Sequence, residues 1–138
     1  MGQQQLLLLV VGIVIVGLAV STGLSAYEQQ QRANEADAVL SRTLMMAQAA
    51  IEWRARDEVF GGGGGGSYAP LEGDGIDLLL LDMSAVRTQV VVPSASSETI
   101  EIVAVSQNNP EVGARVTVNA GYVIDSDVRM DGSIGLPE

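Results

Sequence analysis

The chain has 138 residues, enough for one domain, and its net charge of −10 comes from 17 acidic residues against 7 arginines. This negative charge would repel the phosphates of nucleic acid, so we expect no nucleic-acid partner. The chain has no histidine, lysine or cysteine, the side chains that commonly serve as general base, amine or thiolate nucleophile, or zinc ligand. We therefore predict no enzymatic activity, no catalytic residue, no metal site and no cofactor.

The first predicted element is an apolar segment. No charged residue precedes Glu28, and the sequence from Leu6 to Ala26 is almost entirely aliphatic or small. As a helix this segment rises about 31 Å, close to the roughly 30 Å thickness of the hydrocarbon core of a bilayer. We predict that residues 1–26 form a transmembrane half of a helix. The alternative is a secretory signal cut at Ala19-Val20-Ser21, although the basic region that usually begins such signals is absent.

The helical pattern continues beyond the apolar segment. Residues 27–60 lack glycine and proline, and apolar side chains recur there at intervals of three and four, which places them in one stripe on a helix. The stripe consists of Ala33, Ala36, Leu40, Leu44, Ala47 and Ile51. We predict one helix over about residues 5–60, whose amphipathic half covers a sheet with help from Met45, Met46 and Trp53. A free coiled-coil stalk is the alternative.

A run of six glycines and a serine occupies residues 61–67. Consecutive glycines end a helix and favour flexible coil. A phosphate-binding loop would require a preceding strand and a lysine near its end, and neither is present. We predict that residues 61–75 form a glycine-rich linker and that residues 76–138 form an antiparallel β-domain.

The predicted β-domain contains four short segments with strand patterns. They are residues 76–81, 87–92, 99–106 and 114–119. The intervening segments, residues 93–98 and 107–113, are rich in the residue types typical of turns. Short connections predict antiparallel pairing, and one apolar face then needs cover. We assign that face to Ile100, Ile102, Ala104, Val116 and Val118. The fold class is therefore α+β, with a long N-terminal helix packed on a small antiparallel sheet.

Two groups of aspartates were considered as ion ligands. Asp125, Asp127 and Asp131 lie near one another, and oxygen-rich loops of this kind can bind Ca²⁺. The spacing does not follow the EF-hand pattern, so we interpret the segment as a solvated acidic turn. The same interpretation applies to Asp74, Asp77 and Asp82.

The N-terminal boundary carries a family resemblance. Gly2 is followed by Gln3-Gln4-Gln5 and then by the apolar segment from Leu6. This boundary, followed by a helix that is half apolar and half amphipathic and then by an antiparallel sheet, resembles the type IV pilin and pseudopilin family. The resemblance implies peptidase cleavage between Gly2 and Gln3. It also implies that a set of apolar and glycine residues packs in a filament core: Leu6, Leu7, Val10, Gly12, Val14, Gly17 and Leu18.

The resemblance implies a function as a structural subunit of a type IV pilus-like or pseudopilus-like surface filament. The expected partners are other copies of the chain, the membrane before assembly, and the pilus or secretion assembly machinery. The expected location is the membrane and then the cell surface. Two alternatives stay open: a single-pass membrane-anchored β-domain that acts as a binding or scaffold module, and an exported soluble protein, including an enzyme, released by cleavage near Ser21.

Overall fold

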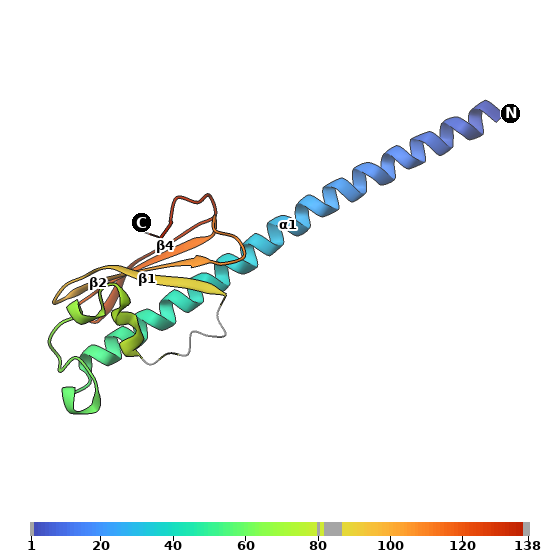
Figure 1. Cartoon of the computed structure of the whole chain (residues 1–138). Helices are drawn as coiled ribbons and strands as arrows, with labels where there is room; N and C mark the ends of the chain where they lie inside the picture. The colour runs from blue at the N-terminus through green and yellow to red at the C-terminus, as the bar shows by residue number, and fades with distance from the viewer. Residues whose placement is uncertain (1, 80, 82–86, 137–138) are drawn as a thin grey trace. The chain divides into compact units, whose positions relative to one another are not determined.

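The computed structural model describes residues 2–79, 81 and 87–136. The chain begins with one long helix and continues into a sheet, which confirms the α+β class (Figure 1). The elements are α1 (Gly2–Ala55), the 3-10 helices η1 (Glu58–Phe60), η2 (Ala69–Leu71) and η3 (Asp74–Leu79), and the strands β1 (Thr88–Ala95), β2 (Thr99–Ser106), β3 (Gly113–Asn119) and β4 (Tyr122–Arg129).

The chain divides into two compact units, Met1–Ala33 and Asn34–Glu138. The boundary lies within α1 and not at the glycine run, because the second half of the helix packs on the sheet and so belongs to the second unit. Helical hydrogen bonding nevertheless continues through the boundary without interruption. The first unit therefore consists of a single helical segment, and the second is a helix–sheet domain.

The sheet is antiparallel, and its strands lie in the order β1-β2-β3-β4. Strand β2 has the residues predicted for it, 99–106, and β3 begins one residue before the predicted segment. Across these two strands the predicted apolar residues are fully buried: Ile100 pairs with Val118, Ile102 pairs with Val116, and Ala104 pairs with Ala114, which was not among the predicted residues. The assignment of this face is confirmed, and these residues form core clusters with the second half of α1.

The helix face that meets the sheet is rotated from the predicted stripe. Its buried residues are Ala36, Val39, Thr43, Met46, Ala47, Ala50 and Trp53. Ala33, Leu40, Leu44 and Ile51 are only partly buried and lie at the margins of the face. Met45 is 56% exposed, so its expected packing was wrong. Leu40, Leu44 and Ile51 still pack against the main core, so the two faces overlap, and the buried face adds Val39, Thr43, Met46, Ala50 and Trp53.

Strand β1 continues to Ala95, through residues that were predicted to form a turn. The register shifts between Val91 and Ser94, which places Pro93 in a β-bulge. Strand β1 lies at an edge of the sheet, and proline is tolerated at edges and bulges because no ladder hydrogen bond is lost there. Pro93, which suggested the end of the strand, therefore marks an irregularity within β1.

The prediction of a strand over residues 76–81 was wrong for residues 76–79, which belong to the 3-10 helix η3, while residue 80 lies outside the described residues. Ile76 and Leu79 are three residues apart and both pack against the main core. In a 3-10 helix residues at this spacing share one face. A short apolar run does not by itself distinguish a strand from such a turn of helix.

Strand β4 was missed, since its residues were interpreted as an acidic turn. Asp125 and Asp127 lie on this strand, paired with Thr117 and Arg115 of β3, while Asp131 follows it. The strand is an edge strand and most of its side chains are exposed. Only Val128 of this strand packs against a core cluster, so the strand has no clear hydrophobic alternation by which the sequence could reveal it.

Candidate functional site

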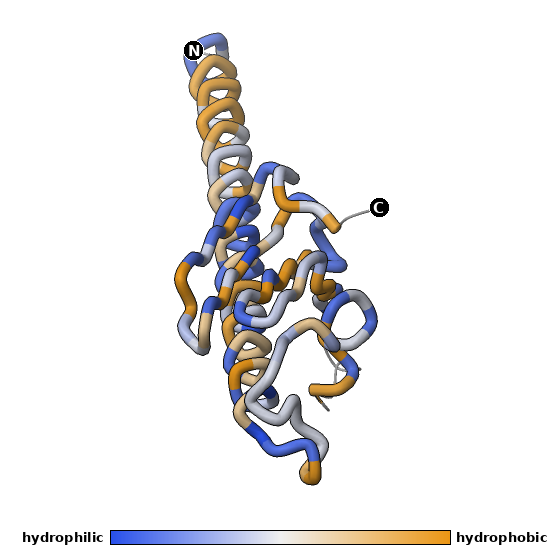
Figure 2. The backbone as a smooth tube through the Cα atoms, turned by 90° about the vertical axis from the view of Figure 1, so that its left-hand side faces the viewer, coloured by the Kyte–Doolittle hydropathy of each residue, from blue (hydrophilic) through white to orange (hydrophobic). Residues whose placement is uncertain are grey.

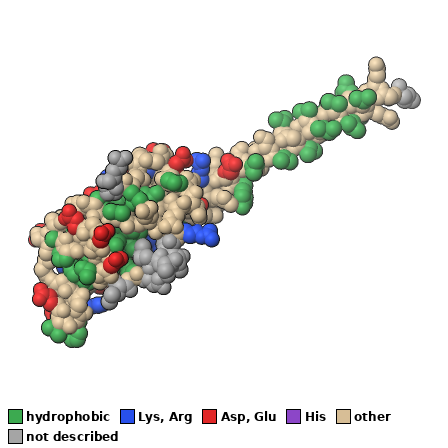
Figure 3. Space-filling view, in the orientation of Figure 1, with side chains coloured by type: hydrophobic (Ala, Val, Ile, Leu, Met, Phe, Trp, Pro, Cys, Tyr) green, Lys and Arg blue, Asp and Glu red, His purple; other side chains and the backbone are tan. Residues whose placement is uncertain are grey.

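The first unit presents an apolar surface that the rest of the described chain does not cover. All residues from Leu6 to Ala26 are exposed, and the large apolar side chains among them are between 44% and 71% exposed. Part of α1 is long and apolar enough to cross a membrane, and none of that part is buried. Figure 2 colours these turns predominantly as hydrophobic, and Figure 3 shows apolar side chains projecting along both edges of the helix. This surface requires lipid or protein cover.

Two polar side chains near the end of this segment, Thr22 and Ser25, make hydrogen bonds within the helix. The Thr22 hydroxyl donates a hydrogen bond to the Leu18 carbonyl at 2.8 Å, and the Ser25 hydroxyl donates to the Ser21 carbonyl at 3.0 Å. Polar groups in a membrane must find partners inside the protein because lipid tails provide none. These hydroxyl groups are therefore compatible with an apolar surrounding.

The residues expected to pack in a filament core lie along this exposed helix. The leucines and valines among them, Leu6, Leu7, Val10, Val14 and Leu18, make no buried cluster within the chain. At Gly12 and Gly17 an added Cβ atom would meet no atom within 4 Å. Both positions are therefore free of intramolecular constraint. Packing between copies at these residues, and cleavage between Gly2 and Gln3 in the exposed first turn, stay predictions.

The glycine run does not form the predicted flexible linker. It folds back over the C-terminal end of α1, where helical carbonyl groups lack partners within the helix. Two backbone N–H groups donate to these carbonyls, Gly63 to Trp53 at 2.8 Å and Gly65 to Arg54 at 2.6 Å, and Gly64 donates to the carbonyl of Arg56, just beyond the helix, at 2.9 Å. These hydrogen bonds cap the helix and explain why α1 ends at Ala55, five residues before the predicted end.

The cap requires glycine for steric reasons. A Cβ atom at Gly63 would lie only 2.7 Å from Cζ3 of Trp53, so the backbone passes directly against the indole ring. Gly65 has a φ of +70°, in the left-handed region that side chains disfavour. The run of glycines thus lets the backbone approach the end of the helix closely.

The remainder of the predicted linker contributes to the core. Tyr68 and Leu71 are fully buried and belong to the same cluster as Trp53 and Ile102. The Tyr68 amide donates to the Ser96 carbonyl at 3.0 Å, which fixes the segment beside the β1–β2 turn. Residues 61–75 are therefore part of the domain, and the predicted boundary at residue 76 was wrong.

The acidic residues of β4 and the following turn make local hydrogen bonds. Arg129 pairs with Asp127 at 3.0 Å, and this carboxylate raises the pKa of Arg129. Hydrogen bonds from Ser133 lower the pKa of Asp131, whose Oδ1 accepts the Ser133 amide at 3.0 Å. Within residues 2–79, 81 and 87–136 no three acidic side chains gather in a metal-binding group. Asp74 and Asp77 are exposed on η3, and Asp82 lies outside the described residues.

Comparisons with protein-family models, with curated proteins and with solved structures gave no match. The proposed function therefore rests on the chemistry and geometry of the chain itself.

Proposed function

We propose that this chain is a non-enzymatic structural subunit of a type IV pilus-like or pseudopilus-like surface filament. The observation that carries the proposal is the uncovered apolar helix surface from Leu6 to Ala26. A helix that is apolar on all sides can exchange lipid for neighbouring copies of itself with little loss of burial. Such an exchange would take the subunit from the membrane into a filament core.

The distribution of charge supports the same proposal. Residues 1–33 carry one acid, Glu28, and one base, Arg32, so the whole net charge of −10 belongs to residues 34–138. A neutral helix can pack closely against its copies without electrostatic repulsion. The strongly acidic helix–sheet domain suits the aqueous outer surface of a filament, where solvent and salt screen its charge.

The direct experiment is electron microscopy of filaments sheared from the cell surface, combined with mass spectrometry of the same material. We expect filaments that contain this chain and whose N-terminal peptide still includes Leu6. Consistent absence of the chain from surface filaments would contradict the proposal. A mature N-terminus beyond Ser21 would contradict it as well, and would favour the exported soluble protein.

A matched pair of variants separates the filament from the rival proposal, a single-pass membrane-anchored binding or scaffold module. Gly17→Leu makes the helix more apolar and removes a residue of low helix propensity, so membrane anchoring should be retained. Because a Cβ atom added at Gly17 would meet no atom within 4 Å beyond its own helical turn, a clash of the larger side chain would have to come from another molecule.

We expect Gly17→Leu to reduce filament formation strongly, while Val16→Leu, a conservative change at the neighbouring exposed position, forms filaments normally. The measurement is the amount of the chain in the sheared fraction relative to the membrane fraction. Equal filament yields from the two variants would favour the anchored module, as would membrane retention of the unaltered chain without any polymer.

A further inference from the structure

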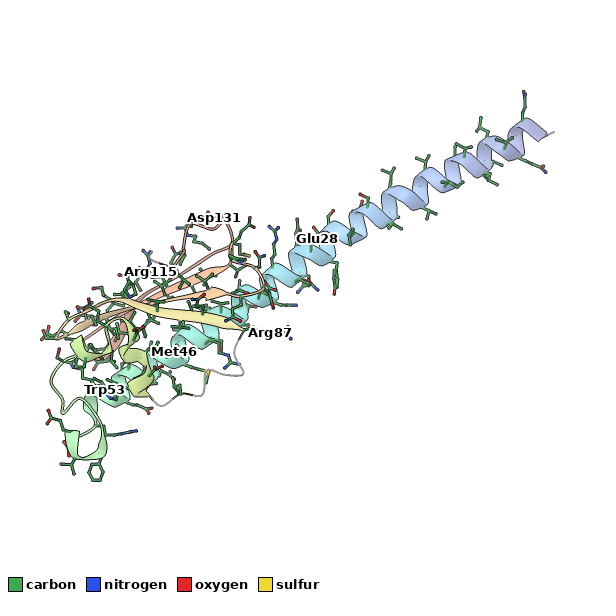
Figure 4. The ribbon with its side chains drawn as sticks, viewed as in Figure 1. Glu28, Met46, Trp53, Arg87, Arg115 and Asp131 are labelled. Carbon is green, nitrogen blue, oxygen red and sulfur yellow. The ribbon has the colours of Figure 1, made fainter. Side chains whose placement is uncertain are left out.

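Tyr27 directly follows the apolar segment of α1. It is the only aromatic residue in residues 1–52, and its side chain is 61% exposed. The first charged residue of the chain, Glu28, comes next, and Figure 4 labels it on the helix. Because the rise from Leu6 to Ala26 matches the thickness of the hydrocarbon core of a bilayer, a segment that spans this core places Tyr27 at its boundary with the lipid headgroups.

The Tyr27 hydroxyl group has one partner within the chain. Gln31, one helical turn later, donates a hydrogen bond from Nε2 to the hydroxyl oxygen at 2.8 Å. A tyrosine hydroxyl both accepts and donates, and no acceptor for its proton occurs among the residues that the structure describes. The hydrogen bond therefore ties the polar tip of the ring to the polar segment 28–32 and leaves the hydroxyl free to donate outside the chain.

The two ends of this side chain require different surroundings. In hydrocarbon the ring would be covered, but the hydroxyl proton would have no acceptor, which is costly. In bulk water the hydroxyl would be satisfied, but the exposed ring would have no apolar cover. The headgroup layer of a phospholipid bilayer provides phosphate and ester oxygens beside the first acyl carbons, and tyrosine is enriched at this depth for that reason.

We propose that Tyr27, with its hydroxyl group oriented by Gln31, anchors this end of the apolar segment in the headgroup layer of a phospholipid bilayer. The ring lies against the acyl chains, and the hydroxyl donates to a phosphate or ester oxygen. The anchor fixes the depth at which α1 enters the membrane. This inference rests on the membrane-embedded state that precedes assembly in the proposed function, and it applies equally to the membrane-anchored module.

The test measures the depth of α1 in phosphatidylcholine vesicles. Because the chain has no cysteine, Ser21→Cys introduces a single thiol for a nitroxide label in the full chain. This position precedes Tyr27 by about 9 Å along the helix. Electron paramagnetic resonance with oxygen and a water-soluble nickel complex as relaxing agents gives the depth of the label below the headgroups. Flotation verifies that the chain is embedded, and Trp53 fluorescence verifies that its domain is folded.

The decisive comparison is between bilayers of different thickness. Dimyristoleoyl phosphatidylcholine forms a thinner bilayer than the dioleoyl lipid, so part of the apolar segment must emerge from it. In the original chain the anchor keeps Tyr27 at the headgroups, and the label depth should be the same in both lipids. In Tyr27→Ala both ends share the excess length, and the label should lie closer to the headgroups of the thinner bilayer by about 1.5 Å or more, the rise of one residue.

Three further variants assign the effect to the hydroxyl group and its partner. Tyr27→Phe keeps the ring without its polar tip, so the label should lie deeper than in the original chain. Gln31→Ala removes the orienting donor and should move the label in the same direction by a smaller amount. Gln29→Ala is the matched control, since Gln29 makes no hydrogen bond to Tyr27, and it should leave the depth unchanged.

The proposal is overturned if Tyr27→Ala and the original chain give the same label depth in both lipids, or if Gln29→Ala moves the label as far as Gln31→Ala. Loss of filaments from Tyr27→Ala without a change in depth would make Tyr27 a contact between copies and would also overturn it. A chain that does not float with the vesicles would contradict both this inference and the membrane state of the proposed function. The expected depth shifts in a chain that forms no filaments would support the anchor and contradict only the filament.

Discussion

The two halves of α1 share one continuous backbone and differ in what covers them. Residues 6–26 are apolar on all sides, and every one of them is exposed. Residues 34–55 bury one face, centred on Ala47 and Ala50, in the core of their own domain. The second half is therefore satisfied within the chain, while the first half must find its cover in a membrane or in other molecules.

This difference assigns the two halves of α1 to different roles. The second half stabilises the fold, and the first half carries the proposed function. Substitutions in the second half should change the stability of the helix–sheet domain. Substitutions in the first half should change anchoring and assembly and leave that domain folded. The following predictions test this division, beginning with the largest expected effect.

The largest effect is expected from Val14→Asp, in the middle of the apolar half. An aspartate near the centre of a membrane helix costs about 2.5–3.5 kcal/mol on insertion scales, which corresponds to roughly a hundredfold or more. Filament assembly should be abolished, and membrane insertion should be weakened. The unfolding transition of the helix–sheet domain, followed by fluorescence of the single tryptophan, Trp53, should not change. Normal filaments from this variant would count strongly against the proposed function.

A second large effect is expected in the sheet. Ile102 is fully buried, whereas Ile124 is 60% exposed on the edge strand β4. Ile102→Ala should lower the free energy of unfolding by about 2–5 kcal/mol because it removes core contacts and leaves a cavity. Ile124→Ala, the matched control, should change it by about 0.5 kcal/mol or less. Urea unfolding measures both, and similar values would show that the assigned core is incorrect.

An intermediate effect is expected in the glycine cap. A Cβ atom at Gly63 would press on Trp53, so Gly63→Ala should destabilise the domain by about 1–3 kcal/mol. At Gly66 the nearest contact of an added Cβ, the Gly63 carbonyl oxygen, is at 3.4 Å. Gly66→Ala should therefore be nearly neutral. If the run were a flexible linker, the two variants would have the same unfolding midpoint in urea.

The smallest effect concerns the turn after β4. Ser133 hydrogen bonds lower the pKa of Asp131 in the folded state, so this carboxylate stabilises the fold above its unfolded pKa. The contribution is lost as the pH falls through the lowered pKa of the folded state. Ser133→Ala removes the hydroxyl and should move the pKa of Asp131 upward, towards the ordinary carboxyl value. Titration of the side-chain carboxyl ¹³C signal measures the shift, and an unchanged pKa would contradict the assignment.

Much of the fold followed from local patterns. Strand β2 coincides with its predicted range, and Ile100 and Ile102 were assigned correctly because they alternate with the partly exposed Thr99 and Glu101. Beyond Ile102 both faces are buried, since Val103 and Val105 form a separate cluster with Ile134. Strand β4 and the 3-10 helix η3 were not identified. The former buries too little to show alternation, and the latter has an apolar run too short to reveal its period.

The candidate sites also differ in how far the sequence alone could reveal them. The apolar helix surface could be recognised from sequence because its signal is length and composition alone. The glycine cap could not, since its hydrogen bonds to Trp53 and Arg54 form only after the glycine run folds back over the end of α1. No residue spacing in the sequence indicates that these segments come into contact.

The sequence by itself determined that the chain begins with an apolar helix, continues into an amphipathic one and ends in antiparallel strands, because these features depend on local periodicity and on burial of side chains. Only the tertiary structure decided which helix face meets the sheet, and it showed that the glycines cap the helix. Both outcomes depend on close contacts between distant residues, above all the small side chains around Ala47 and the approach of Gly63 to Trp53. Such contacts depend on shape complementarity in three dimensions, which local residue preferences do not encode.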